Sequence, residues 1–200
     1  MEEEVATMVS PVDPNEVRLT GENSYIRLGE QEGGPLTTRS SHWRVLYSPA
    51  GPGHVLFIQS ELTDNQVRIY ADNVALVRWL QGEIESTIYE GFADESTPVS
   101  DACFVRYGDV RSFSTEKVVS GDTEISLTWY DFVEPFVVRS QPGSTPGRPH
   151  GVYNTHVPAR KAQLTVNGKL AKGRPFPMDR SGHVSSTCSL AWSETWVRPR

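Results

Sequence analysis

The amino-acid sequence predicts a mainly β protein of one domain, built as a single antiparallel β-barrel with one short helix. Three observations favour this fold class: short apolar stretches follow one another along the 200-residue chain, turn residues separate most of them, and only one stretch has helical spacing. Such a succession of strands is typical of closed barrels and sandwiches, which often reach this length as one unit.

The domain is expected to begin near residue 17. Residues 1–16 carry three consecutive glutamates and two prolines, a composition that predicts a flexible N-terminal segment. Residues 17–200 show no break in composition, so we expect them to form one barrel domain.

The first half of the domain reads as a run of strands. A continuous apolar stretch, 55–58, is of the kind that is buried on both faces of a sheet. Glycine and proline at 33–35 and 49–53 predict turns between strands. The strands expected here are 17–19, 25–28, 43–47, 54–61 and 66–70.

One helix is predicted after these strands. Asp72 or Asn73 can cap its first free amides. Apolar residues then follow a helical stripe that would pack against the sheet, with Leu76 and Trp79 off the stripe and with Gly82 ending the helix early. The residues of the stripe are Val74, Val77, Leu80, Ile84 and Ile88.

The second half returns to strands. Asn167-Gly168 predicts a hairpin with a type I′ turn, because this pair tolerates the positive φ angles that the turn needs. Residues 141–151, rich in proline and glycine, are expected to form a long loop. The strand segments expected here are 103–107, 113–119, the stretch 124–136, 152–157, 162–166, 169–171 and 187–196.

The strand that begins at Glu124 contains the first candidate catalytic residue. Alternation puts Ile125, Leu127 and Trp129 on one face, and the same count places Asp131 there. A carboxylate among buried apolar groups is costly unless it is paired or protonated, so its presence needs a reason.

The closing strand repeats this pattern. Its even positions place Glu194 between Trp192 and Trp196. If both strands face a common interior, Asp131 and Glu194 can act as acid and base without a cofactor, as a lyase, hydratase or isomerase requires. An ion pair of either acid with Arg106 or Arg44, or a bulge that turns it to solvent, stays open. Glu134 replaces Asp131 if a bulge precedes Pro135.

His150, Tyr153 and His156 form a second candidate group. His156 is assigned as a third catalytic residue, because a histidine with a near-neutral pKa commonly shuttles protons. The spacing matches no zinc signature, so no metal and no cofactor are expected. A loop histidine and a hydrogen-bonded strand histidine with no functional role are the alternative.

Aromatic residues complete the predicted binding site. Together with a few polar groups they favour a barrel pocket for a small hydrophobic or aromatic molecule, although aromatic residues also fill ordinary β-cores. A non-catalytic carrier or sensor, an interaction module with a filled core, and a homodimer stay open. The predicted substrate-binding residues are Arg106, Tyr107, Trp129, Tyr153, Trp192 and Trp196.

Charge and cysteine usage narrow the classes of partner. The net charge of −6 and the pI near 5.4 argue against nucleic acid and anionic membranes, which need a basic surface. The N-terminus lacks the basic and apolar regions of a signal peptide, so a cytoplasmic protein is expected. Cys103 and Cys188 are expected as free, buried thiols, with a single disulfide as the alternative.

The C-terminal quarter resembles a known family. The segments 161–168 and 179–182, followed by the tryptophan-rich closing strand, are similar to the lipocalin-like (calycin) barrels of the carotenoid 1,2-hydratase group. This resemblance implies a barrel that acts on or holds an apolar molecule. The Gly-x-Trp signature of lipocalins is absent, and no catalytic residue is transferred from the family.

Overall fold

The computed structural model describes residues 15–109 and 111–199. The predicted flexible segment 1–16 lies outside this part, except for residues 15 and 16, which belong to the first strand. Twelve of the described strands form one sheet, and β12 (Pro177–Arg180) and β13 (His183–Ser186) form a separate hairpin. The strands of the large sheet are β1 (Asn15–Gly29), β2 (Leu36–Tyr47), β3 (Gly53–Ser60), β4 (Val67–Ala71), β5 (Val99–Asp101), β6 (Cys103–Asp109), β7 (Phe113–Ser120), β8 (Thr123–Phe132), β9 (Phe136–Ser140), β10 (Gly151–Val166), β11 (Lys169–Leu170) and β14 (Cys188–Pro199).

The large sheet is a nearly closed, barrel-like structure, which confirms the mainly β barrel prediction. Its strand order runs β5-β4-β3-β2-β1-β14-β10-β8-β7-β6, with β9 and β11 added to β10. The two ends of this order meet, because only Ala102 separates β5 from β6 along the chain. The amide of Ala102 donates to the Ala71 carbonyl at 3.0 Å, and the Ser120 hydroxyl donates to the Asp101 carbonyl at 2.7 Å.

The prediction of a purely antiparallel sheet is wrong at one pair of strands. β4 and β5 are parallel, because the chain crosses between them through the helical segment and re-enters the sheet in the same direction.

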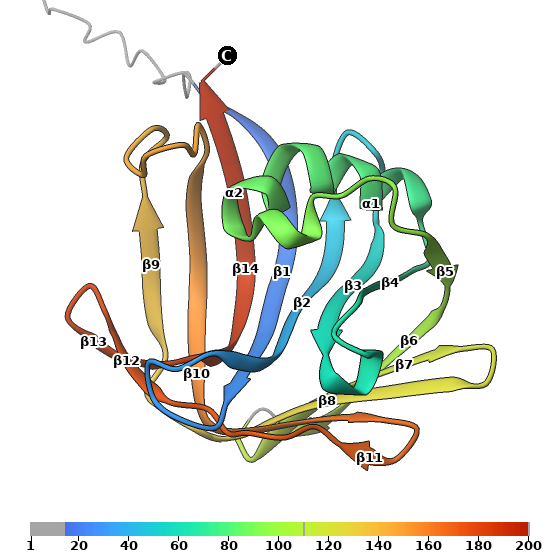
Figure 1. Ribbon diagram of the computed structural model, residues 1–200. Helices are drawn as coiled ribbons and strands as arrows, with labels where there is room; N and C mark the ends of the chain where they lie inside the picture. Colours follow the sequence, from blue (N-terminus) through green and yellow to red (C-terminus); the bar gives the residue numbers. More distant parts are fainter. Residues whose placement is uncertain (1–14, 110, 200) are drawn as a thin grey trace, which may run out of the picture.

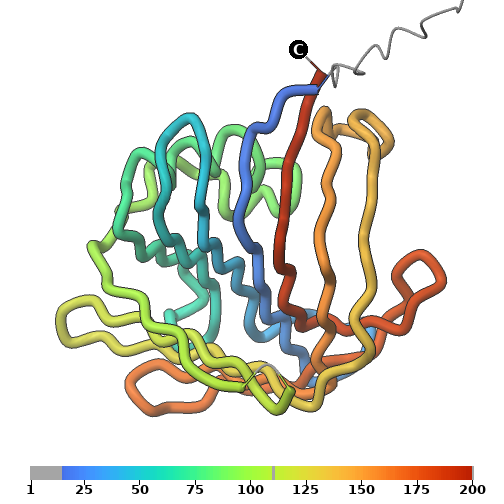
Figure 2. The backbone as a smooth tube through the Cα atoms, turned by 180° about the vertical axis from the view of Figure 1, so that it is seen from behind, coloured from blue at the N-terminus to red at the C-terminus, as the bar shows by residue number. Residues whose placement is uncertain are grey.

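Seen from behind, Figure 2 shows the yellow β7–β8 hairpin lying across the lower parts of the blue and cyan strands.

Strand β10 serves both halves of the sheet. Its first half pairs with β14 and β9, and its second half pairs with β8. Pro158 lies where β10 leaves β14, and its carbonyl accepts from the Val133 amide at 2.8 Å. A proline is tolerated where a ladder ends because it has no amide to donate, so the two strands predicted at 152–157 and 162–166 form one. The predicted turn at Asn167 and Gly168 is present, with φ angles of 49° and 75°.

The helical segment lies in front of β14, β1 and β2 near one end of the molecule (Figure 1). Asn73 caps it as predicted, because its side-chain oxygen accepts from the Leu76 amide at 3.1 Å. Gly82 does not end it: a π-turn carries the chain from α1 into α2. Leu76 is buried and Val74 is exposed, opposite to the predicted stripe. The segment comprises α1 (Val74–Leu80), the π-turn (Gln81–Glu85), α2 (Ser86–Ile88) and a 3₁₀ turn (Glu90–Phe92). Among the described residues, no helix has the length and apolar character that crossing a membrane requires.

Two apolar cores lie on opposite faces of the long strands. The barrel core joins β1, β3, β8, β10 and β14, and it includes the predicted Ile125, Leu127 and Trp129. The second core joins the helical segment to Trp43, Phe57 and neighbouring side chains. We call the strand face beneath the helical segment the front face. Side chains from both halves of the sheet fill the barrel core.

Both cysteines are free thiols. Cys188 is buried in the barrel core, and burial raises the pKa of its thiol to about 12. Cys103 is exposed on β6. The prediction of two free, buried thiols is therefore right for Cys188 and wrong about the burial of Cys103.

Candidate functional site

A cluster of buried and half-buried polar groups occupies the front face between the helical segment and the β12–β13 hairpin. It combines two carboxyl groups, a histidine, two tyrosines and four arginines, so it differs from the apolar cores on either side. We call it the front-face cluster. Its members are Tyr25, Arg27, Arg39, Ser41, Glu85, Tyr89, Arg148, Asn154, His156, Arg180, Ser185 and Glu194.

Glu194 is the buried acid that the sequence predicted beside tryptophan. It is 3% exposed, and its Oε1 accepts a hydrogen bond from Trp196 Nε1 at 2.6 Å. Its Oε2 accepts from Asn154 Nδ2 at 3.0 Å. Burial raises the pKa of this carboxyl to about 7, although both hydrogen bonds and the charges of Arg180 and Arg148 act in the opposite direction. Glu194 can therefore both give and take a proton at neutral pH.

A bulge separates Glu194 from Trp192. Tyr153 of β10 pairs with Thr195 of β14, and Thr155 pairs with Trp192, so β14 has one extra residue at this point. Ser193, within this bulge, has a φ of 51°. One inserted residue turns the following side chains to the other face. Trp192 consequently packs against the barrel core, whereas Glu194 and Trp196 face front. The prediction that both tryptophans flank Glu194 on one face is wrong for Trp192.

The second buried carboxyl of the cluster is Glu85, which no pattern in the sequence predicted. It is 0% exposed, and its Oε1 accepts from Ser41 Oγ and from Trp43 Nε1, both at 2.6 Å. Burial raises the pKa of Glu85 against these hydrogen bonds. Each buried carboxyl is thus held by an indole N–H, and the rings of Trp43 and Trp196 lie 6.1 Å apart.

No local signal marked Glu85. It ends the π-turn, which inserts an extra residue into the helical repeat and shifts the inward-facing positions. A regular helix read from the apolar stripe does not place residue 85 inside. The sequence shows an acid in this position but not the turn that buries it.

His156 lies fully buried on the same face of β10 as Asn154. Its Nε2 is 3.3 Å from the Tyr25 hydroxyl and 3.3 Å from Ser185 Oγ. Burial, and next the charge of Arg180, lower the pKa of His156 to about 3, so its ring is neutral at pH 7. Burial raises the pKa of Tyr25, so its hydroxyl stays protonated and can donate. The expectation of a near-neutral histidine pKa is therefore wrong, although the residue lies in the cluster.

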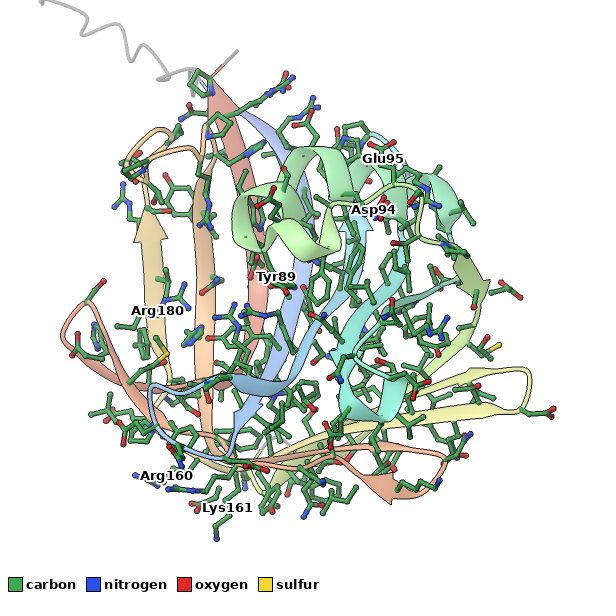
Figure 3. The ribbon with its side chains drawn as sticks, in the orientation of Figure 1. Tyr89, Asp94, Glu95, Arg160, Lys161 and Arg180 are labelled. Carbon is green, nitrogen blue, oxygen red and sulfur yellow. The ribbon has the colours of Figure 1, made fainter. Side chains whose placement is uncertain are left out.

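Four arginines face these groups without a carboxylate partner. Among residues 15–109 and 111–199, no carboxylate oxygen lies within 4.0 Å of the guanidinium groups of Arg27, Arg39, Arg148 and Arg180. Three of them stack on aromatic rings instead. Figure 3 shows Tyr89 beneath the helices and Arg180 near β10. This part of an acidic protein is locally basic.

Asp131 lies outside this cluster. Its side chain is 39% exposed and lies 3.5 Å from both Arg160 Nη1 and Lys161 Nζ; Figure 3 shows these two cations at the lower edge of the molecule. Its φ of 56° breaks the alternation of β8. The prediction that Asp131 faces the interior is therefore wrong. Glu134 is also exposed, at a cleft of about 520 Å³ next to His183.

The remaining predicted residues are dispersed over the fold. Trp129 and Trp192 belong to the barrel core, and Tyr107 is 50% exposed on β6. Tyr153 donates to Gln141 Oε1 at 3.4 Å, away from His156 on the opposite side of β10. His150 is buried against the Trp196 ring, and its Nε2 lies 3.4 Å from Glu83 Oε2. Of the predicted site residues, the structure brings together Glu194, Trp196 and His156.

Arg106 lies outside the front-face cluster and forms ion pairs with Glu116 and Glu22. Its Nε donates to Glu116 Oε2 at 2.9 Å, its Nη1 lies 2.6 Å from Glu22 Oε2, and Arg44 Nη2 donates to Glu116 Oε1 at 3.2 Å. The internal ion pair considered for Arg106 and Arg44 therefore forms with Glu116, which is 1% exposed. In the described part of the chain, no three His, Cys, Asp or Glu side chains converge as metal ligands do.

Comparisons with known proteins give no match. No family model, no curated protein and no solved structure matches this chain.

Proposed function

We propose that this protein binds a small organic molecule at the front-face cluster and transfers a proton to or from it, as a cofactor-independent lyase, hydratase or isomerase does. The observation that carries the proposal is the carboxyl of Glu194, which is buried beside Trp196 and Asn154 and whose pKa of about 7 lies near neutral pH. A general acid–base catalyst is most effective when its pKa lies there, because both protonation states are then populated.

The neighbouring groups fit the other roles that such a reaction needs. Glu194 would take a proton from a carbon next to a carbonyl and return one from solvent. Tyr25, protonated and 3.3 Å from His156 Nε2, would donate to the carbonyl oxygen as negative charge develops there. Trp196 would hold the carboxyl and provide an aromatic wall.

The proposed site differs in position from that of a lipocalin-like barrel. In that type the ligand lies inside the barrel, but here apolar side chains fill the barrel core. If this barrel is of the lipocalin-like type, its ligand would lie on the front face and not inside the barrel. The proposed ligand is still a small molecule with a hydrophobic or aromatic body, because Tyr25, Tyr89 and Trp196 line the cluster.

A non-catalytic carrier or sensor is the second candidate. One observation favours it: both oxygens of Glu194 already accept hydrogen bonds, from Trp196 and from Asn154. A carboxyl that only organises the site would show the same contacts.

Hydrogen exchange separates the two candidates without knowledge of the natural reaction. The protein is incubated in D₂O with aryl-substituted 2-oxo acids, and loss of the C–H signal next to the carbonyl is followed by NMR. We expect Glu194→Gln to lower the exchange rate by about 100-fold or more and to retain binding. Asp131→Asn, which changes an exposed acid, is the matched control and should exchange like the wild type.

Exchange at the wild-type rate in Glu194→Gln would contradict the assignment of Glu194. Binding of these acids by the wild type without any exchange above the buffer rate would favour the carrier.

A further inference from the structure

Arg27 and Arg39 are directly opposite each other on neighbouring strands. The register of β1 and β2 pairs them, and both lie on the front face, because Ile26 and Leu28 belong to the barrel core. Like charges directly opposite on adjacent strands destabilise a sheet. The fold therefore keeps an unfavourable pair in its central strands.

No acid of the described residues forms an ion pair with either guanidinium group, although the charge of Glu85 acts to raise the pKa of Arg39. Glu85, on the helical segment above, is not within ion-pair distance of either guanidinium, and its Oε1 is bonded to Ser41 and Trp43. Its Oε2 is buried without a hydrogen-bond partner among the described residues, and burial raises the pKa of this carboxyl. The charge of Arg27 also helps to lower the pKa of Arg39, after the larger effect of burial, as expected of two close cations.

The two guanidinium groups are nevertheless held in place. Arg27 lies over the Tyr25 ring at 4.7 Å, and Arg39 lies over the Tyr89 ring at 4.0 Å. The Tyr89 hydroxyl donates to Gln59 Oε1 at 2.9 Å, which fixes that ring. Stacking covers the faces of the guanidinium groups and leaves their N–H edges for hydrogen bonds. Arg27 Nε is buried and has no acceptor in the described part of the chain.

A cleft of about 240 Å³ opens beside Arg39. Its wall includes Gln59 and Tyr89, together with Leu36, Thr37 and Asn65. The cleft is thus part polar and part aromatic. Arg39 lines it, and Arg27 lies opposite Arg39 on the neighbouring strand. Arginine edges bind planar or tetrahedral oxyanions through paired hydrogen bonds.

We infer that Arg27 and Arg39 bind the anionic group, a carboxylate or a phosphate monoester, of a small organic ligand whose aromatic part lies against Tyr89. The inference rests on the proposed small-molecule site, but it does not require catalysis at Glu194. It names the substrate class: an organic anion. An oxyanion between the two guanidinium groups would replace their mutual repulsion by charge-assisted hydrogen bonds.

The test uses three aromatic probes of similar size: benzoate, phenyl phosphate and neutral benzyl alcohol. Binding to the full-length protein is measured by calorimetry, and each variant is checked by its thermal unfolding midpoint. We expect benzoate or phenyl phosphate to bind tighter than benzyl alcohol, and comparison of the two anions identifies the preferred oxyanion. Arg27→Gln and Arg39→Gln should each weaken anion binding by about 10- to 100-fold, the usual effect of losing a hydrogen bond between charged groups.

Arg68→Gln is the matched control, because Arg68 is exposed on β4, and it should bind like the wild type. A readout that a purely structural role would not change is the anion-induced rise of the unfolding midpoint. That rise should disappear in the Arg27 and Arg39 variants and persist in Arg68→Gln.

Equal affinity of the wild type for benzyl alcohol and for both anions would overturn the inference and leave the small-molecule site standing. Unchanged anion affinity in both arginine variants would also overturn it. If none of the three probes binds, the proposed small-molecule site fails, and the inference fails with it.

Discussion

Glu116→Ala is expected to lower the free energy of unfolding by about 3–5 kcal/mol, the usual cost of removing one partner of a buried ion pair. Glu116 is 1% exposed and accepts hydrogen bonds from Arg44 and Arg106. Burial raises the pKa of this carboxyl, but His42 when protonated and the two guanidinium groups outweigh burial, so the pKa lies below its usual value. The variant leaves two guanidinium groups next to the buried ring of His42, without their shared acceptor.

Urea unfolding and the thermal midpoint measure this effect. For a domain of this size the midpoint should fall by about 10 °C. Glu124→Ala is the control: Glu124 is 51% exposed and pairs with Lys117 at 2.7 Å, so its loss should leave the midpoint nearly unchanged. A midpoint for Glu116→Ala that equals that of the control would show that the buried ion network does not stabilise the fold.

The pH dependence of stability is the second large effect, and it comes from Glu194. In the unfolded chain this carboxyl loses its proton near pH 4.5, and in the folded protein near pH 7. Between these values the unfolded state binds fewer protons, so the contribution of Glu194 to stability falls as pH rises. The contribution is fully present below about pH 4.5 and is lost above about pH 7. From pH 5 to pH 8 the loss amounts to about 2–3 kcal/mol.

Two buried histidines, His42 and His156, have the opposite effect on the pH dependence of stability. Burial lowers the pKa of His42 to about 4 and that of His156 to about 3, so their contributions are lost as pH falls below about 6.5. Comparison with Glu194→Gln isolates the carboxyl, because both proteins keep both histidines. In urea unfolding, the stability of the wild type relative to this variant should fall between pH 5 and pH 8. A difference that does not vary with pH would mean that Glu194 titrates alike in the folded and unfolded chain.

Local chemistry made much of the fold predictable. The Asn73 cap and the Asn167-Gly168 turn depend on a few adjacent residues, and both are present. The alternation of Ile125, Leu127 and Trp129 also held, because the barrel core requires one strand face to be apolar. The parallel β4–β5 pair was missed, since strand direction depends on the crossover connection and not on the strand sequences.

Most of the front-face cluster depends on features that sequence alternation does not contain. The positive φ of Asp131 directs this predicted acid to solvent, and the π-turn buries a different acid, Glu85, in the cluster. Arg27 and Arg39 come together only through the register of β1 and β2. Glu194 was found because its tryptophan neighbour predicted burial. The sequence therefore predicted part of the character of the site, a buried acid beside a tryptophan. Most of the residues that form it could be identified only from the three-dimensional fold.

The protonation of Glu194 is the most direct test of this account. Carboxyl carbons of ¹³C-labelled glutamate are followed by NMR from pH 3 to pH 9, and Glu194→Gln assigns the signal. We predict a titration of Glu194 near pH 7, with Glu116 titrating below 4.5 in the same spectra. Titration of Glu194 near 4.5, as in an exposed glutamate, would contradict the account.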